Sequence, residues 1–277
     1  MSHDVSISAL LRASVAGGSV SLPHPRSTPG VADREEAEAG LAALGKRLDD
    51  LQERLWAEGT RSLLLVLQGM DTSGKGGTVR HVLRTMNPAG VDVAAFGEPT
   101  EEELAHHFLW RIERRLPGPG EVAVFDRSHY EDVLVVRVRG LVPGDTWRAR
   151  YEEINAFERR VSDAGTTIVK CFLHISYEEQ RERLLARLRN PSKHWKFRER
   201  DVDERRWWSD YMTAYDDAIV RCSSDGAPWF VIPADRKWYR NWAIAQLLVE
   251  TLEAMDPRYP ESALDVAALE ARLAPPN

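Results

Sequence analysis

A glycine-rich stretch follows closely on an apolar run, and its residue types suit phosphate binding. Residues 63–67 read Leu-Leu-Leu-Val-Leu, and residues 69–78 read Gly-Met-Asp-Thr-Ser-Gly-Lys-Gly-Gly-Thr. A buried strand leading into Gly-x4-Gly-Lys is typical of a P-loop, because the glycines let backbone N–H groups turn toward phosphate oxygens and the next helix presents its positive end. The alternative is a glycine-rich turn that only joins a strand to a helix.

The residues of this loop have separate predicted roles. Lys75 is predicted to reach the phosphoryl group being transferred. Asp71 is a candidate Mg²⁺ ligand, because a carboxylate would repel phosphate unless a cation lay between them; capping of the following turn is the alternative. We assign phosphate binding to the rest of the loop: Gly69, Thr72, Ser73, Gly74, Gly76, Gly77 and Thr78.

A second motif begins where Val-Ala-Val-Phe at 122–125 runs into Asp126. In an open α/β sheet the site lies beyond the carboxyl ends of the strands, so Asp126 should face the P-loop. With Asp71 it would hold Mg²⁺ jointly with phosphate oxygens. Arg127 follows directly and is predicted to bind phosphate in bidentate fashion; a surface ion pair with Glu131 is the alternative.

A basic segment, residues 181–206, is the third element, and we call it the lid. It holds ten Lys or Arg residues against five Asp or Glu. This surplus in an acidic chain indicates a polyanion partner, and such a segment in nucleotide kinases is a mobile lid over phosphates. A solvated charged face is the alternative. The residues assigned to phosphate are Arg183, Arg187, Lys193 and Lys196.

The pattern along the chain predicts strands that alternate with helices, hence a parallel sheet covered on both faces. We expect an α/β P-loop kinase fold: three layers, α/β/α, with five parallel strands and a helical lid. Residues 34–257 form this domain, residues 1–33 a flexible N-terminal arm and residues 258–277 a C-terminal tail. Strands are expected at 63–67, 91–96, 122–125, 166–175 and 229–233, and helices from 34 and at 76–86, 100–116, 146–164, 178–188, 203–223 and 238–252.

The composition is that of a globular protein, with 43% hydrophobic and 29% charged residues among 277. A net charge of −6 argues against general nucleic-acid binding. No apolar stretch reaches transmembrane length, and the residues from Met1 to Asp4 do not open a signal peptide. Cys171 and Cys222 lack metal-ligand spacing, so we expect reduced thiols and a cytoplasmic location.

Five segments together resemble the polyphosphate kinase 2 family. They are Gly-Met-Asp-Thr-Ser-Gly-Lys at 69–75, Phe-Leu-Trp-Arg-Ile at 108–112, Asp-Arg-Ser-His-Tyr-Glu-Asp-Val-Leu-Val-Val-Arg-Val at 126–138, Asn-Pro-Ser-Lys-His-Trp-Lys-Phe at 190–197 and Ala-Pro-Trp-Phe-Val-Ile-Pro-Ala-Asp-Arg-Lys-Trp-Tyr-Arg-Asn at 227–241. The resemblance implies phosphoryl transfer between inorganic polyphosphate and nucleotides, with Mg²⁺, in the cytosol, by a dimer or tetramer. The pair Glu131-Asp132 is similar to the class III branch, which accepts nucleoside mono- and diphosphates.

Three positions depart from the family pattern. Gly76 stands where relatives usually have Asp, Gly97-Glu98 where many have Lys, and His107 where an acidic residue is common. The catalytic set of Asp71, Lys75, Asp126 and Arg127 is intact.

We therefore expect a polyphosphate-dependent nucleotide kinase that converts AMP or ADP to ADP or ATP and binds neither nucleic acid nor membrane. Nucleotide binding is assigned to Tyr130, Glu131 and Trp195, with packing of the lid as the alternative for Trp195. Two other functions stay open. One is an NTP-dependent small-molecule kinase of the same fold, and the other is a catalytically weak protein that binds polyphosphate as a regulator.

Overall fold

The computed structural model describes residues 5–273 and is built around one parallel sheet. Five strands are hydrogen-bonded in the order β4-β5-β3-β6-β7, all parallel. Parallel strands require crossover connections that cover both faces of the sheet, and their sequences are therefore apolar throughout. The central strand β3 is buried along its whole length. The strand bounds are β3 Ser62–Gln68, β4 Val91–Ala95, β5 Val122–Asp126, β6 Thr166–His174 and β7 Trp229–Pro233.

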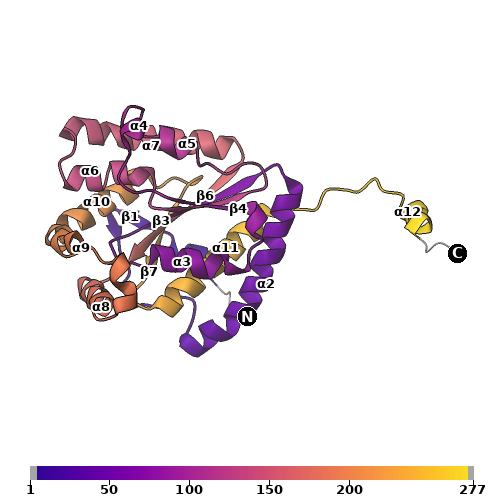
Figure 1. Cartoon of the computed structure of the whole chain (residues 1–277), viewed down its shortest axis with the longest axis horizontal. Coiled ribbons are helices and arrows are strands. Elements are labelled where there is room, and N and C mark those ends of the chain that lie inside the picture. The colour runs from indigo at the N-terminus through magenta and orange to yellow at the C-terminus, as the bar shows by residue number, and fades with distance from the viewer. Residues whose placement is uncertain (1–4, 274–277) are drawn as a thin grey trace.

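Helices cover the sheet from both sides, as Figure 1 shows, with α2, α3 and α11 on one face and α5, α6 and α7 on the other. The fold class is thus confirmed as a three-layer α/β/α arrangement around a five-stranded parallel sheet. The helix bounds are α1 Ile7–Leu11, α2 Arg34–Glu58, α3 Lys75–Val82, α4 Glu101–Leu104, α5 Trp110–Glu113, α6 Val135–Val138, α7 Gly144–Asp163, α8 Tyr177–Leu188, α9 Glu199–Asp203, α10 Trp208–Arg221, α11 Lys237–Met255 and α12 Val266–Leu273.

The register of the central strands brings the two predicted motifs together. Leu67 near the end of β3 is the partner of Asp126 at the end of β5. Since the two strands are parallel, the P-loop and the segment after Asp126 leave the sheet at the same edge. The juxtaposition therefore follows from strand pairing alone.

The N-terminal segment differs from the expected arm. We predicted residues 1–33 to be a flexible arm without a core of its own, but Ile7, Leu11, Val20 and Val31 are buried against the core of the domain. The backbone N–H groups of Ile7 and Ser8 donate to the carboxylate of Glu250 on α11, at 2.8 and 2.9 Å. A short antiparallel pair, β1 Ser14–Ala16 and β2 Ser19–Ser21, was not predicted either. Apolar residues spaced irregularly through a Ser-, Gly- and Pro-rich stretch gave no periodic signal.

The helix predicted over 100–116 is also wrong as a single element. Its capping box is present, with Thr100 and Glu103 bonding each other's backbone N–H groups, but the helix ends at Leu104 and a second one begins at Trp110. The break lets Leu109 and Ile112 enter the core. Burial of these two side chains, rather than helix propensity, therefore determines where the helix breaks.

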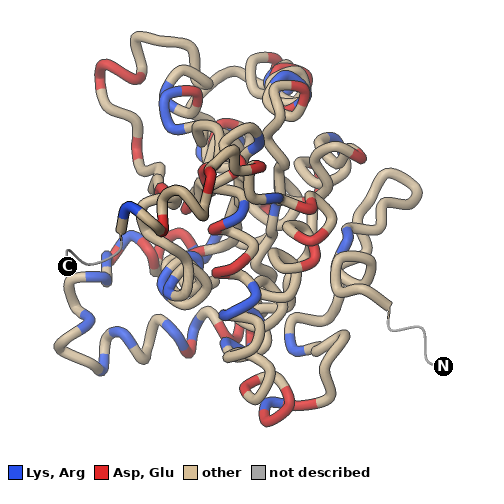
Figure 2. The backbone as a smooth tube through the Cα atoms, turned by 90° about the vertical axis from the view of Figure 1, so that its right-hand side faces the viewer, with Lys and Arg blue, Asp and Glu red and all other residues tan. Residues whose placement is uncertain are grey.

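The last described helix, α12, stands away from the body at the end of an extended segment (Figure 1). The tail predicted for 258–277 includes residues 274–277, which lie outside the described part of the chain, as do residues 1–4 of the predicted arm. Within residues 5–273, no helix combines the length and apolarity needed to cross a membrane. Figure 2 shows both signs of charge interspersed along the chain. The basic surplus of the lid is local, because the whole chain has a net charge of −6.

Candidate active site

The P-loop runs from β3 into α3 with the backbone geometry that its glycines allow. Gly69 and Gly74 have φ values of 153° and 108°, in the region that glycine adopts most easily. Thr72 in the loop and Arg127 after β5 also have positive φ, at 65° and 66°, although neither is glycine. Such conformations in ordinary residues are costly and cluster at functional sites. Of the three non-glycine residues with positive φ in the described chain, two thus belong to the predicted motifs, and the third, Asp256, follows α11.

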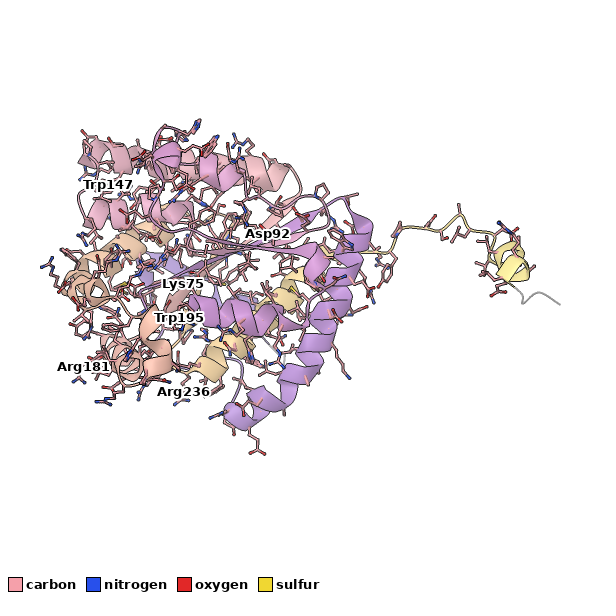
Figure 3. The ribbon with its side chains drawn as sticks, viewed as in Figure 1. Lys75, Asp92, Trp147, Arg181, Trp195 and Arg236 are labelled. Carbon is pink, nitrogen blue, oxygen red and sulfur yellow. The ribbon has the colours of Figure 1, made fainter. Side chains whose placement is uncertain are left out.

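Lys75 begins α3 and lies inside the body, where only 7% of its surface is exposed (Figure 3). Its Nζ donates to the carbonyl oxygen of Gly69 at 2.7 Å and to that of Met70 at 3.5 Å. Burial and the nearby charge of Arg127 lower the pKa of Lys75, while Asp126 and Asp71 act in the opposite direction. The lysine thus sits among the predicted catalytic groups.

Three hydroxyl groups of the P-loop are buried and have no hydrogen-bond partner among residues 5–273. They are Thr72 Oγ1, Ser73 Oγ and Thr78 Oγ1. Buried polar atoms in native proteins nearly always have a partner, so unsatisfied groups gathered in one loop point to a polar ligand. Phosphate oxygens and the water molecules around a hydrated cation both fit such a site.

The predicted carboxylates lie around this loop. Asp71 Oδ1 accepts a hydrogen bond from an Arg127 terminal nitrogen at 3.1 Å. Gly76 faces Asp126, because a Cβ built on Gly76 would lie 3.7 Å from Asp126 Oδ2. A side chain at position 76 would therefore enter the carboxylate site. Among residues 5–273 no three His, Cys, Asp or Glu residues form a group that holds a metal alone. Mg²⁺ is usually held by one or two carboxylates together with substrate phosphates, so two carboxylates fit this metal.

Glu131 belongs to the same charged group. It is half-buried, and burial raises its pKa, while Arg127 and Lys75 act to lower it. The alternative to phosphate binding for Arg127 was an ion pair with Glu131, but its hydrogen-bonded carboxylate partner is Asp71. Arg127 is thus held at the site by a residue of the P-loop.

Arg183 has a different role from the one predicted. It is buried, and all five of its N–H donors are used within the protein. The acceptors are Glu179 Oε1 and the carbonyl oxygens of Thr72, Ser73, Ala234 and Asp235, at 2.6 to 3.0 Å. Arg183 therefore fastens the P-loop to α8 and to the segment after β7, and has no donor left for phosphate.

Tyr130 is also not placed for its predicted role in nucleotide binding. Its side chain is fully buried, and its hydroxyl donates to Glu158 at 2.8 Å and accepts from Lys170 at 2.9 Å. Lys170 further donates to the other Glu158 oxygen at 2.6 Å, and His129 lies 3.1 Å from Glu158. This buried network fixes the segment after Asp126 to the core of the domain.

The remaining predicted lid residues stay exposed or half-exposed. Lys193, Trp195 and Lys196 lie on a 3-10 helix over Pro191–Lys196, and 77% of the Trp195 surface is exposed. Lys196 Nζ lies 4.6 Å from the centre of the Trp195 ring, a cation–π contact. Within the described chain, the side chains of Arg187, Lys193 and Lys196 take part in no ion pair. They are available to a polyanion, and their role stays a prediction.

Two residues near the loop were missed by the sequence analysis. Gln180 donates to the carbonyl oxygen of Asp71 at 3.3 Å, and Arg240 donates to that of Ser73 at 3.3 Å. Arg240 falls within the segment 227–241 that carries the family resemblance, and this was the available signal. Gln180 lies in a strongly charged helix and gave none.

Comparison with known proteins agrees with this geometry. The family model described as polyphosphate kinase 2 matches residues 31–260. The chain belongs to the polyphosphate kinase 2 family. The match includes the P-loop, the segment after β5, the lid and α11, so every residue of the candidate site lies inside it. The resemblance inferred from the sequence motifs is confirmed.

Similar proteins of this family include two curated relatives and one solved structure. An AMP/ADP-polyphosphate phosphotransferase of Meiothermus ruber is 54% identical over 228 residues, which cover 82% of this chain and 85% of that protein. An ADP-polyphosphate phosphotransferase of Rhodopseudomonas palustris is 43% identical over 78% of this chain and 79% of its own. The crystal structure of polyphosphate kinase 2 from Arthrobacter aurescens TC1 superposes with a TM-score of 0.93 at 48% identity, and covers 99% of this chain and 98% of that one.

Proposed function

We propose that this chain is a polyphosphate-dependent nucleotide kinase that transfers a phosphoryl group between inorganic polyphosphate and AMP or ADP, giving ADP or ATP. The observation that carries the proposal is the meeting of Lys75, Asp71, Asp126 and Arg127 at one sheet edge, beside a lid with unpaired cations. The names of the two relatives, which specify AMP or ADP and polyphosphate, support the same reaction.

The chemistry needs positioning and positive charge more than covalent catalysis. A terminal phosphate oxygen of the nucleotide attacks the end phosphorus of polyphosphate. A new P–O bond forms, the P–O bond to the rest of the chain breaks, and a polyphosphate shorter by one unit leaves. The attacking oxygen is already ionised at neutral pH, so no strong general base is required. Lys75, Arg127 and the P-loop N–H groups neutralise and orient the phosphates.

Phosphoryl transfer of this kind generally requires a divalent metal. We propose Mg²⁺, with Asp71 and Asp126 as its protein ligands, and when bound it neutralises charge on the reacting phosphates. The unpaired hydroxyl groups of Thr72, Ser73 and Thr78 support this site. Glu131 beside Arg127 and the exposed ring of Trp195 remain our candidates for contacts to the nucleotide.

The proposal includes a compartment and an assembly state. Cys171 and Cys222 are both free and buried, which supports a reducing compartment, the cytoplasm. A homo-oligomer, either a dimer or a tetramer, is proposed from the family resemblance. Size-exclusion chromatography with light scattering measures that state directly.

The function is tested with purified protein, Mg²⁺ and one donor at a time. We expect ADP from AMP and ATP from ADP when long-chain polyphosphate is the donor, as measured by anion-exchange chromatography of the nucleotides. Rapid turnover of ATP or GTP with small acceptors, and none of polyphosphate, would favour the NTP-dependent kinase instead. Binding of polyphosphate without any nucleotide product would identify a regulator.

A prediction for the lid follows from its unpaired cations. Replacing Arg187 and Lys193 with Ala should raise KM for polyphosphate by about tenfold and change KM for the nucleotide less. Cations that grip a polyanion act partly by releasing its counterions, so the salt dependence of KM should also become less steep. Initial rates over a series of salt and polyphosphate concentrations measure both effects.

The matched control replaces one Arg and one Lys that lie outside the lid. Arg159 on α7 and Lys46 on α2 are exposed and form no ion pair within the described residues. Their double Ala variant removes the same charge. If the lid variant keeps the salt slope and the kinetics of this control, the lid is only a solvated charged face.

A further inference from the structure

Buried cations in this protein divide into two groups. Five Lys or Arg residues are buried in the described chain: Lys75, Arg111, Lys170, Arg183 and Arg240. Three of them have a carboxylate oxygen within 4.0 Å, namely Arg111 with Glu103, Lys170 with Glu158 and Arg183 with Glu179. Lys75 and Arg240 have none. Both of these unpaired cations lie against the P-loop, although they come from different helices.

Arg240 reaches the loop from α11 and is 4% exposed. One of its terminal nitrogens donates to the carbonyl oxygen of Ser73 at 3.3 Å, and its Nε and other terminal nitrogen donate to Asn241 Oδ1 at 3.2 and 2.8 Å. Lys75 bonds the carbonyl oxygen of Gly69 at the other end of the loop. The two cations therefore bracket the loop, one at each end.

The glycines of the loop fit the Arg240 guanidinium closely. A Cβ built on Gly74 would lie 1.7 Å from one terminal nitrogen, and a Cβ built on Gly77 would lie 3.2 Å from the other. Any side chain at position 74 would displace the guanidinium group. Close approach of a cation is thus a reason for Gly74 in addition to its positive φ of 108°.

A buried guanidinium without a carboxylate is costly. Burial, together with the like charge of Arg183, lowers the pKa of Arg240 to about 10. Its hydrogen bond to Ser73 does not explain the charge, because the same carbonyl oxygen already accepts from Arg183 at 3.0 Å. Stability alone would favour an uncharged residue at this position.

We propose that Arg240 is a positioning residue for a phosphate group bound in the P-loop. Arg240 holds the loop at Ser73 and supplies a positive charge, which the bound phosphate neutralises. This proposal rests on the proposed function, because it identifies the bound phosphate as part of a polyphosphate chain. Arg240 and Arg183 both donate to the Ser73 carbonyl oxygen, and we infer that this holds the loop in the shape in which its free N–H groups can bind phosphate. The charge of Arg183 is balanced by Glu179, so Arg240 supplies the positive charge that remains for phosphate.

The experiment compares Arg240→Met, Arg240→Lys and the exposed control Arg159→Met. Isothermal titration with inorganic tripolyphosphate measures binding without turnover, and differential scanning calorimetry measures the stability of the free protein. We expect Arg240→Met to weaken tripolyphosphate binding by about tenfold or more, with no loss of Tm, since an unpaired buried charge is removed. Arg240→Lys should recover part of the affinity. KM for polyphosphate should rise in Arg240→Met by more than KM for ADP.

Unchanged tripolyphosphate affinity in Arg240→Met would overturn the proposal, and so would a Lys variant that binds no better than the Met variant. If Arg240→Met does not fold, Arg240→Gln takes its place, with the same expected loss of affinity. The outcome is separate from that of the proposed function. A wild type that binds ATP but not tripolyphosphate would refute polyphosphate as donor, while titration of the same variants with ATP would still test Arg240.

Discussion

Replacing Asp126 or Asp71 with Asn is expected to lower kcat by about 10²-fold or more while the fold is retained. Each substitution removes one of the charges proposed to hold Mg²⁺ against the phosphates in the transition state. The Mg²⁺ concentration for half-maximal rate should rise in both variants. Steady-state rates over a series of Mg²⁺ concentrations, together with the circular dichroism spectrum of each variant, measure the effect.

The two carboxylates are distinguishable, because Asp71 also bonds Arg127 at 3.1 Å. If Asp71 only orients Arg127, Asp71→Asn will lose rate but keep the Mg²⁺ dependence of the wild type. The control is Asp92→Asn near the start of β4, which lies away from Lys75 (Figure 3). Asp92 forms an exposed ion pair with Arg115. Activity within a few-fold of this control in either variant would remove that residue from the site.

The second large effect concerns stability, and it is expected for Lys170→Met. Lys170 is fully buried and bonds Glu158, the Tyr130 hydroxyl and the carbonyl oxygen of Cys222. Removing one partner of a buried ion pair leaves the other charge uncompensated, at a cost of about 3–5 kcal/mol. Tm should therefore fall by about 10 °C, as measured by calorimetry.

A double variant tests the reason for that loss. Burial alone would raise the pKa of Glu158, but Lys170 and His129 hold it below its usual value. Adding Glu158→Gln to Lys170→Met removes the uncompensated charge and keeps an acceptor for Tyr130, so most of the lost Tm should return. Lys46→Met on the surface is the control. A Lys170→Met protein as stable as this control would show that the network contributes nothing.

The sequence predicted the elements that position the site because those elements carry strong local signals. The apolar runs of β3 and β5, the glycines of the P-loop and Asp126 at a strand end are all readable without tertiary contacts. Their juxtaposition follows from a general rule for parallel sheets, and the pairing of Leu67 with Asp126 bears it out.

The errors concern side chains whose partners lie far away in sequence. Arg183 was assigned to phosphate because it lies in a basic helix, yet its acceptors include the carbonyl oxygens of Thr72 and Ser73, more than 100 positions earlier. Tyr130 was assigned to the nucleotide because of its motif, but its partner is Glu158. A local sequence pattern shows that a residue is charged or polar, but it does not show which distant carbonyl or carboxylate accepts its hydrogen bonds. Lys170, a charged residue within the apolar strand β6, is a sequence signal for this buried network that the sequence analysis did not use.

The central claim is that the phosphoryl group comes from polyphosphate. The most direct measurement incubates the purified protein with radiolabelled long-chain polyphosphate, unlabelled ADP and Mg²⁺, and follows the label by thin-layer chromatography. The account predicts that label enters the terminal phosphate of ATP as the polyphosphate shortens, and that Asp126→Asn prevents the transfer. Unlabelled nucleotides after exhaustive incubation, together with label transfer from radiolabelled GTP under the same conditions, would contradict it.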